Sequence, residues 1–511
     1  MKKYFLTIDN GGTNTKSVIF DIEGNQINSV SFPTMRIEDK SGYHEIDLHV
    51  LWKAIAQSIK EVIKQSNINR ADIIGVSCVG HGKGLYMLDR GKNIFTHGIL
   101  STDSRASSMT VEFENKINDI FSITHQHVME SQAPILLSWL KKNNPNIYSN
   151  IGFVLSAKDF VRFKLTDSLN QEYGDASSNN LLNIESCDYD SRIFDFFNIK
   201  EMTDKMPDLL QFDALAGRIT AESSVMTGLS EGTPVFGGMF DIDACAIATG
   251  VINEDFFSVI AGTWNINTFP SNEFVNRNQK LMSSIYPTGS NLIEASSPTS
   301  AGNLSIMLKM LMNNEIDNAK EDGRNIYEIL EEFLIHTDAT FSKVLFFPFL
   351  YGSNTDKDAE GTFLGIQSNT TKSEMIRAVY EGITFAHKQH VDQLVDFLGH
   401  KPKAIRISGG ATNSNSWMAM FANVLNIPVQ VVSGTEIGGL GGAIVSALGC
   451  GIYKDLNEAV NCMVHLEKEF VPSDDQVLIY EKKYETFLAF INSMQNTWSY
   501  LKTMQKEMEK K

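Results

Sequence analysis

Apolar residues in the first ninety positions switch between a period of two and a period near 3.6. Runs around Ile8 and Ile19 flank Asn10-Gly11-Gly12, so residues 4–21 are predicted to form a strand, a glycine-rich turn and a second strand. Apolar positions within 47–65 share one helical face, and Asp47 can cap the start of that helix. A buried strand is expected over 73–79. This alternation predicts an α/β fold.

The first turn carries the residue types that bind phosphate. Gly11 and Gly12 are expected to tolerate positive φ and to let backbone N–H groups approach an anion. Thr13 adds a hydroxyl, and Lys16 adds a cation. Asp9 closes the first strand and is suited to hold a hydrated Mg²⁺. The alternative is an ordinary hairpin with a polar turn.

A second segment repeats this pattern. Residues 256–265 again combine an apolar strand with a Gly-Thr turn, here Gly262-Thr263, and the alignment puts Ala261 where the first copy has Asp9. Two such turns are what a duplicated phosphate-binding fold would contain. They could hold the phosphates of one nucleotide from two domains.

Asp241 is the candidate catalytic base. Residues 233–241 are predicted to form a strand that opens into Gly237-Gly238 and ends at this acid, and a small-residue helix is expected over 244–248. Asp243 is the rival, but it is expected to enter that helix. Phosphoryl transfer needs a carboxylate that takes the proton of the acceptor hydroxyl.

The C-terminal half offers a candidate adenosine site. A strand over 404–408 is predicted to end in the loop Gly409-Gly410-Ala411, where a flat base and ribose could lie against the backbone. Asn413 could donate a hydrogen bond to them. Thr371 begins a capping box that predicts a helix start, and residues 484–504 form an amphipathic helix expected to pack on the second domain.

A second glycine-flanked loop could bind the acceptor. Gly80-His81-Gly82-Lys83-Gly84 follows the strand over 73–79, and His81 and Lys83 could donate to sugar hydroxyls. The alternative is that both are solvated surface residues. Asp103 and Arg105 are either a further part of this site or a local ion pair. Residues 172–179 are predicted to form a loop.

Composition narrows the partners. The 511 residues predict two domains, and the net charge of −17 argues against nucleic acid and against an anionic membrane surface. No apolar run reaches membrane-spanning length, so a cytoplasmic protein is expected. The cysteines are scattered without a C-x-x-C, which predicts reduced, mostly buried thiols and no zinc site: Cys78, Cys187, Cys245, Cys450 and Cys462.

The opening motif resembles the first phosphate motif of the actin-like ATPase superfamily, and no P-loop is present. The ordered set of segments along the whole chain resembles the FGGY carbohydrate kinases. Those segments are residues 4–21, 75–89, 99–105, 158–159, 237–241, 262–263, 347–352 and 409–417.

Within that family, three stretches are most similar to members that phosphorylate L-xylulose or 3-keto-L-gulonate: residues 81–85, 294–304 and 347–354. D-xylulose kinases typically have Met-His in place of Gly82-Lys83 and Gly-Glu-Arg in place of residues 352–354. Lys83 would also suit a carboxylate-bearing sugar.

The resemblance implies two actin-like, ribonuclease-H-like domains around a central cleft, here 1–246 and 247–511, the second ending in the amphipathic helix. It implies ATP and Mg²⁺ as cofactors, Asp241 as general base and Asp9 at the metal. ATP would contact Thr13, Lys16, Gly262, Thr263, Gly409, Gly410, Ala411 and Asn413. The sugar would lie at His81, Gly82, Lys83, Asp103 and Asp241.

We therefore expect an ATP-dependent ketose kinase of carbohydrate catabolism, acting on L-xylulose or 3-keto-L-gulonate. A D-xylulose, L-ribulose or polyol kinase is the alternative within the family. An actin-like ATPase switch without a sugar substrate is the alternative from another class. The expected partners are a small sugar and ATP, and the oligomeric state stays open, a homodimer included.

Overall fold

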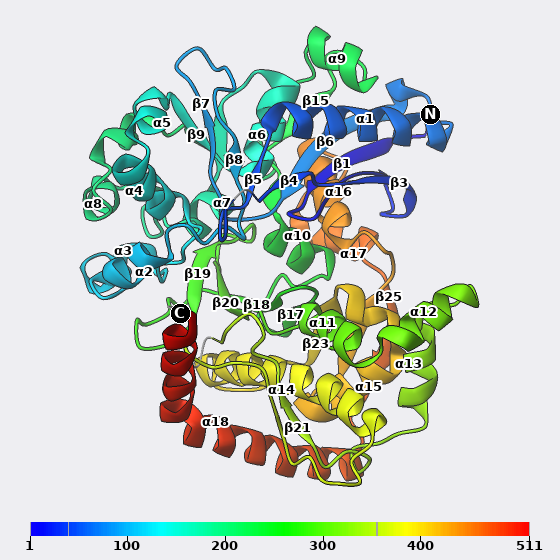
Figure 1. The fold of residues 1–511 in the computed structure, drawn as a ribbon. Helices are drawn as coiled ribbons and strands as arrows, with labels where there is room; N and C mark the ends of the chain where they lie inside the picture. The colour runs from blue at the N-terminus through cyan, green and yellow to red at the C-terminus, as the bar shows by residue number, and fades with distance from the viewer. Residues whose placement is uncertain (1, 39, 354–355, 510–511) are drawn as a thin grey trace. The chain divides into compact units, whose positions relative to one another are not determined.

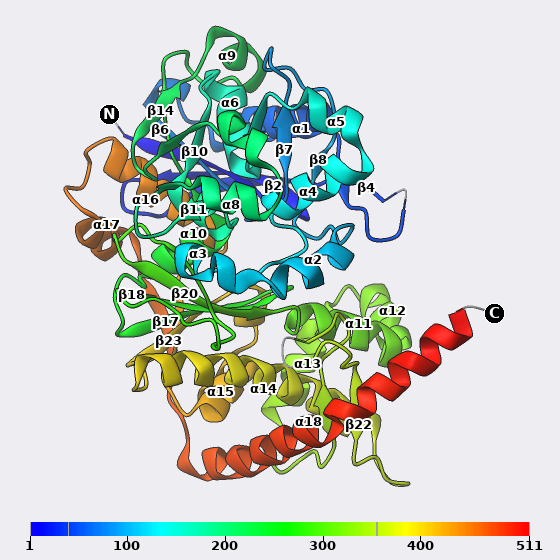
Figure 2. The same ribbon diagram turned by 90° about the vertical axis from the view of Figure 1, so that its left-hand side faces the viewer.

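The structure is a computed structural model that describes residues 2–38, 40–353 and 356–509. Asn354, the last residue of the stretch 347–354, lies outside the described residues. The chain forms two compact units. Unit 1 comprises Met1–Ile252, Pro270–Ile293 and Ser433–His465, and unit 2 comprises Asn253–Phe269, Glu294–Val432 and Leu466–Lys511. Figures 1 and 2 show the helices and strands of both units.

Unit 1 is built on a mixed sheet. Its strand order is β14-β15-β6-β1-β2-β3, with β16 also paired to β6. The β1–β2 and β2–β3 pairs are antiparallel, whereas β6 runs parallel to β1. The strands are β1 (Tyr4–Asn10), β2 (Asn14–Asp21), β3 (Gln26–Pro33), β6 (Ile73–Gly80), β14 (Leu215–Arg218), β15 (Pro234–Phe236) and β16 (Met239–Phe240).

Two helices cover the faces of this sheet (Figure 1). Helix α1 (Leu48–Ser66) packs its apolar residues on the face that presents Leu6 and Ile8, and Asp47 caps its start as predicted. Helix α16 (Ile437–Gly449) packs on β1 and β6. Because side chains alternate along a strand, Thr7 points to the other face, where it meets Gly442 of α16.

Helix α16 also packs against α10 (Asp241–Ala248). The small residues of both helices make this approach close, since a Cβ on Gly441 would lie 2.3 Å from the Ala244 carbonyl oxygen. The Ser77 hydroxyl, from β6, donates to the Gly442 carbonyl at 2.6 Å. These contacts fix the start of α10 relative to the carboxyl ends of β1 and β6.

Unit 2 repeats this topology. Strand β17 (Phe256–Ala261) is antiparallel to β18 (Asn265–Ser271) and parallel to β23 (Ala404–Ser408), as β1 is to β2 and β6. The sheet continues on either side with β20 (Asn291–Ser297), β24 (Val429–Val432) and β25 (Leu466–Phe470). The prediction that the opening hairpin recurs near residue 256 is therefore confirmed.

The long helices of unit 2 begin and pack as the sequence predicts. Thr371 and Glu374 form the capping box of α14 (Lys372–Leu398). Helix α18 (Asp474–Glu509) extends along unit 2 (Figure 2). Its Phe487 stacks on Phe347 with ring centroids 4.7 Å apart. None of the described helices is long and apolar enough to cross a lipid bilayer.

Two local predictions are wrong. Residues 173–178 form helix α7 (Tyr173–Ser178) instead of a loop, because the Glu172 carboxylate accepts hydrogen bonds from the N–H groups of Gly174 and Asp175 and so caps the helix. The cysteines are not mostly buried: only Cys78 is buried, while Cys187 and Cys462 are exposed.

Candidate active site

The first hairpin of unit 1 places Asp9 and Lys16 side by side. They are direct neighbours across β1 and β2, and Lys16 Nζ lies 2.8 Å from Glu436 Oε2. Burial raises the pKa of Asp9 to about 6, the Lys16 ammonium opposes this shift, and the Glu436 carboxylate adds to it. Thr13 is exposed at the tip of the turn.

The glycines of this turn act through their lack of a side chain. Although both residues tolerate positive φ, neither Gly11 nor Gly12 adopts it. A Cβ on Gly12 would have only the Ser101 hydroxyl, 4.0 Å away, within contact range. The Gly12 carbonyl accepts two hydrogen bonds from Arg36, at 3.0 and 2.7 Å. Arg36 therefore anchors the turn, and the lack of a side chain at Gly12 leaves space beside the backbone. An anion could approach the backbone N–H groups through that space.

Asp241 is the first residue of α10, so the expectation that it closes a strand is wrong; β16 ends at Phe240. Burial raises the pKa of Asp241 to about 7, the negative charges of Asp9 and Asp175 add to this shift, and the Lys83 ammonium opposes it. The negative charge of Asp9 therefore repels that of ionised Asp241. Such a carboxylate can be free to accept a proton near neutral pH.

Asp243 occupies the same helical turn but is completely buried. A Cβ on Gly174 would lie 2.6 Å from Asp243 Oδ2, so this carboxylate faces the start of α7. It also bears on Tyr286, whose pKa is raised by burial and by this negative charge. The Asp243 carboxylate therefore lies inside the protein, near Gly174 and Tyr286.

His81 and Lys83 differ sharply in their partners. His81 Nδ1 lies 3.2 Å from the Gly82 carbonyl oxygen and Nε2 lies 3.0 Å from the Tyr86 hydroxyl, while burial lowers the His81 pKa to about 4. The neutral ring therefore holds the loop in place. Lys83 is 8% exposed, with φ of 61°, and no described residue forms an ion pair or hydrogen bond with its ammonium.

The Asp103–Arg105 pair predicted as one alternative is present. Asp103 Oδ1 accepts from Arg105 Nε at 2.9 Å and Oδ2 accepts from Nη2 at 2.8 Å. The backbone N–H of His44 also donates to Asp103 Oδ2, at 2.7 Å. Both carboxylate oxygens of Asp103 therefore accept hydrogen bonds from other residues of the protein, and Asp103 stabilises the local backbone conformation.

Sequence reasoning missed a buried charge cluster beside Asp241. Lys158 Nζ lies 2.8 Å from Asp159, 3.5 Å from Glu172 and 3.4 Å from Asp175. Arg162 Nη1 lies 2.7 Å from Asp159 Oδ1. The cluster thus contains two cations and three carboxylates. The negative charge of one of these carboxylates, Asp175, raises the pKa of Asp241. The available signal was the i, i+3 spacing of Asp159 and Arg162 on one helix face.

In unit 2, the predicted nucleotide residues surround the end of β17. Gly409 has φ of 97°, and a Cβ there would lie 2.7 Å from the Ala261 carbonyl oxygen, so only glycine fits. Gly410 faces open space, and the Asn413 side chain donates to the Gly410 carbonyl at 3.2 Å. Gly409, Gly410, Ala411 and Asn413 thus line a short 3-10 turn next to Gly262.

The Gly262-Thr263 turn is held by α11 (Ala301–Leu311), since a Cβ on Gly302 would lie 3.2 Å from Thr263 Cγ2. A buried network supports both segments. His387 Nε2 lies 2.9 Å from Ser300 Oγ, and Nδ1 lies 3.3 Å from Asn267 Oδ1. Sequence reasoning noticed residues 294–304 only for their likeness to relatives and did not detect this network.

Magnesium fits the donors of unit 1. The described residues contain no cluster of three His, Cys, Asp or Glu side chains that would form a cage for a metal ion. Mg²⁺ is usually held by one or two carboxylates together with substrate phosphates. Asp9, a half-buried carboxylate beside a predicted phosphate turn, matches that donor set.

Comparison with known proteins agrees along nearly the whole chain. Residues 4–248 match the model of the N-terminal domain, and residues 257–450 that of the C-terminal domain, of the FGGY family of carbohydrate kinases. A probable L-xylulose kinase of Haemophilus influenzae is 31% identical over 499 residues, covering 96% of this chain and 99% of the relative.

An L-xylulose/3-keto-L-gulonate kinase of Escherichia coli is 27% identical over 508 residues, covering 98% of this chain and 99% of the relative. Among solved structures, ligand-bound xylulose kinase from Lactobacillus acidophilus superposes with a TM-score of 0.88 at 22% identity, covering 98% of this chain and all of that one. The last likeness shows the fold, a two-domain α/β fold of the actin-like ATPase kind.

Proposed function

Since this chain belongs to the FGGY family of carbohydrate kinases, we propose that it transfers the γ-phosphoryl group of ATP to L-xylulose or 3-keto-L-gulonate. Family membership makes it a carbohydrate kinase, so an ATPase switch without a sugar substrate is not retained. The relatives of H. influenzae and E. coli are named for these two sugars, which supports the choice. Because the reaction consumes ATP in sugar catabolism, the proposal includes a cytoplasmic location.

The observation that carries the proposal is the electrostatic effect of the Lys83 ammonium on Asp241. Asp241 has a pKa of about 7, and the Lys83 ammonium opposes the upward shift of that pKa without forming an ion pair with any described residue. A buried cation is costly unless it is paired or hydrogen-bonded. A sugar oxygen or carboxylate at Lys83 would meet that need and would bring a hydroxyl towards Asp241.

In the proposed reaction, Asp241 takes the proton of the acceptor hydroxyl while that oxygen forms a bond to the γ-phosphorus. The bond from the γ-phosphorus to the bridging oxygen of ADP breaks, which releases ADP and the sugar phosphate. Thr13, Lys16, Gly262 and Thr263 would contact the phosphates, and the 410–413 turn would hold adenosine. Mg²⁺, when bound at Asp9, would offset phosphate charge.

A coupled assay of ADP release tests the substrate. The purified chain is supplied with ATP and Mg²⁺ and then with single sugars: L-xylulose, 3-keto-L-gulonate, D-xylulose, L-ribulose and a polyol series. We expect turnover to require a sugar and kcat/KM to be highest for one of the first two. If kcat/KM is highest with D-xylulose, L-ribulose or a polyol, the proposed substrate is wrong. The assignment as a carbohydrate kinase would still hold.

Lys83→Met tests the cation directly. The variant keeps side-chain length but removes the ammonium, so we expect KM for the sugar to rise about tenfold or more, in line with a lost charged hydrogen bond of roughly 1.5–3 kcal/mol. KM for ATP should stay within twofold. Lys53→Met, at an exposed lysine of α1, is the matched control. An unchanged sugar KM in the Lys83 variant would show that Lys83 does not contact the sugar.

A further inference from the structure

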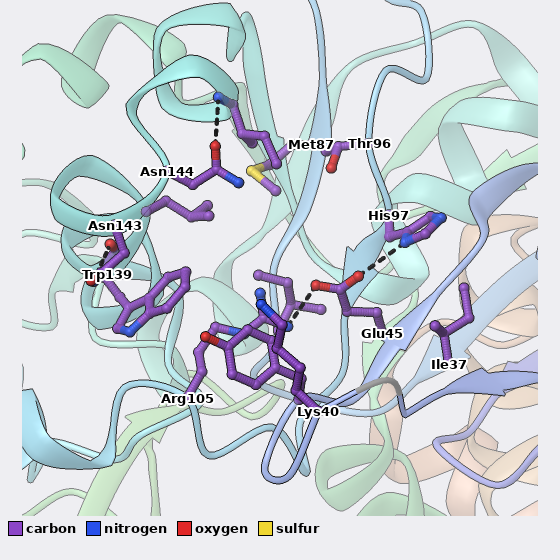
Figure 3. Close-up of a pocket in the computed structure, with 14 residues that line it drawn as sticks. Ile37, Lys40, Glu45, Met87, Thr96, His97, Arg105, Trp139, Asn143 and Asn144 are labelled. Carbon is purple, nitrogen blue, oxygen red and sulfur yellow. Dashed lines mark hydrogen bonds and ion pairs between the residues drawn. The ribbon is translucent and has the colours of Figure 1, made fainter.

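A cavity of about 550 Å³ lies in unit 1, among residues that the proposed reaction does not use (Figure 3). Its walls come from the loop bearing Lys40 and Tyr43, from Glu45 of β5 (Glu45–Ile46), from His97 just before β8 (Gly98–Ile99), and from α4 (Ala133–Asn143), which contributes Trp139. This volume is within the usual range for small-molecule sites.

The cavity and the loop of residues 81–84 lie on opposite faces of one strand. In β7 (Tyr86–Leu88), Met87 lines the cavity, whereas the hydroxyl of the adjacent Tyr86 contacts His81 Nε2. Successive side chains of a strand point to opposite faces. None of the residues assigned above to ATP, the sugar or the metal lines the cavity.

Among the described cations at the cavity, Lys40 alone has no carboxylate partner. Glu45 is already engaged by two groups, with Oε1 2.7 Å from Arg105 Nη2 and Oε2 2.9 Å from His97 Nδ1. Lys40 has a cation–π contact with Tyr43 at 5.4 Å, and none of the described carboxylates pairs with it. A cation that no described carboxylate pairs with, at the wall of a cavity, favours an anionic occupant through its local field.

Arg105 presents a further donor. Its Nε and Nη2 bind Asp103 and Glu45, and among the described residues no hydrogen-bond acceptor is found for Nη1. Its guanidinium stacks on Tyr43, 4.3 Å from the ring centroid. A guanidinium held in place on several sides is pre-organised to bind a phosphate or carboxylate.

The remaining wall suits a polyhydroxylated molecule. Trp139 supplies an aromatic face, and its ring lies 5.7 Å from that of Tyr43 in an edge-on arrangement. Asn144, whose Oδ1 accepts from the Ile147 N–H at 3.5 Å, also lines the cavity, as does Thr96. Flat aromatic faces beside amide and hydroxyl groups are the surfaces against which sugar rings bind.

We propose that this cavity is an effector site for a phosphorylated sugar, separate from the site at which the sugar substrate is phosphorylated. The anionic group binds between Lys40 and Arg105, and the sugar ring lies against Trp139. Ile99, which lines the cavity, exchanges two backbone hydrogen bonds with Leu85, at 2.9 and 2.8 Å. Leu85 directly follows the 81–84 loop, so an occupant can shift that loop.

Binding is tested by calorimetry on the full chain without nucleotide, with D-glucose 6-phosphate as the probe because a ketose kinase does not form it. We expect one site per chain, with glucose and inorganic phosphate each binding at least tenfold more weakly. Lys40→Glu should weaken the probe at least tenfold, while Lys142→Glu, at an exposed lysine of α4 outside the cavity, should change it less than threefold. Equal binding of phosphate alone, or equal effects of the two variants, would overturn the proposal.

Two further measurements locate the occupant. The probe should change tryptophan fluorescence in the wild type but not in Trp139→Phe, which keeps an aromatic ring; a probe-induced change of the same size in that variant would place the probe elsewhere. The probe should also alter the KM of whichever sugar the chain phosphorylates by at least twofold, and not in Lys40→Glu. Binding without any kinetic effect would overturn the effector role, and competition by the substrate sugar would overturn the separation of the two sites.

Discussion

Asp241 combines two properties that a general base for a sugar hydroxyl needs. It starts α10, where its backbone is fixed by the packing of α10 on α16, and its pKa lies near 7. Asp241→Asn keeps the shape and loses the base. We expect kcat to fall at least about a hundredfold, since general-base assistance is typically worth about 10²–10⁴, with ATP affinity nearly unchanged. Steady-state kinetics with the preferred sugar measure this.

Asp243→Asn is the matched control, because it alters the same helical turn. Asp243 is completely buried against the start of α7, so we expect this variant to lower the melting temperature and to keep kcat within about tenfold of the wild type. An inactive but well-folded Asp243 variant, together with an active Asp241→Asn enzyme, would assign the base to Asp243.

The raised pKa of Asp241 also predicts how stability depends on pH. Its ordinary value of 3.8 applies to the unfolded chain, so between about pH 4 and 7 the folded state binds more protons than the unfolded one. Stability contributed by this group is present below pH 4 and lost as pH rises to about 7. Asp241→Asn removes that loss.

We therefore expect the metal-free Asp241→Asn protein to gain stability over the wild type as pH rises from 4.5 to 7.5, by on the order of 1–2 kcal/mol because the carboxylate keeps some access to water. Thermal melts of both proteins in a chelating buffer, at three pH values, give the difference directly. A difference that is constant with pH would show that Asp241 titrates normally.

At the scale of elements, the sequence correctly predicted the features that depend on residues close together in the chain, such as turns and helix caps. The turn of the opening hairpin, the Asp47 cap of α1 and the capping box at Thr371 each depend on residues within a few positions of one another. The topological repeat of β1–β2 in β17–β18 was also visible, because the same strand-and-turn pattern recurs.

The errors arose where distant or unusual contacts decide the structure. Helix α7 begins at a glutamate cap, which is not among the preferred capping residues. Asp241 starts a helix because β16, paired with β6, ends one residue earlier. The ion pairs of Lys158 join segments up to 17 positions apart, and no periodicity reveals them.

The close approach of α10 and α16 yields a test at this scale. A Cβ at Gly441 would lie 2.3 Å from the Ala244 carbonyl oxygen, a backbone atom, whereas a Cβ at Gly438 would meet only side-chain atoms at 3.5 Å and beyond. We expect Gly441→Ala to destabilise the protein by about 1–3 kcal/mol, as overpacking does, and to lower kcat by displacing Asp241. Gly438→Ala should melt within about 1 °C of the wild type, given alanine's higher helix propensity. Equal melting temperatures for both variants would show that the two helices can separate without cost.

At the scale of the whole molecule, the residues of the proposed sugar and adenosine sites belong to different units. Unit 1 carries the 81–84 loop and Asp241, and unit 2 carries the Gly262-Thr263 and 410–413 turns. Both units contribute a Gly-Thr turn, at Gly12-Thr13 and Gly262-Thr263. The proposed reaction therefore assigns the sugar to unit 1 and adenosine to unit 2.

Hydrogen exchange followed by mass spectrometry tests that assignment. A ligand that binds the native state slows exchange at the backbone it covers. We expect sugar alone to protect peptides spanning residues 80–85 but not 409–414. A non-hydrolysable ATP analogue with Mg²⁺ should protect 409–414 and both Gly-Thr turns. Peptides of α9 (Ala221–Thr227), which carries none of these residues, serve as the internal control. Protection of 409–414 by sugar alone, or of residues 80–85 by the ATP analogue alone, would contradict the assignment of sugar to unit 1 and adenosine to unit 2.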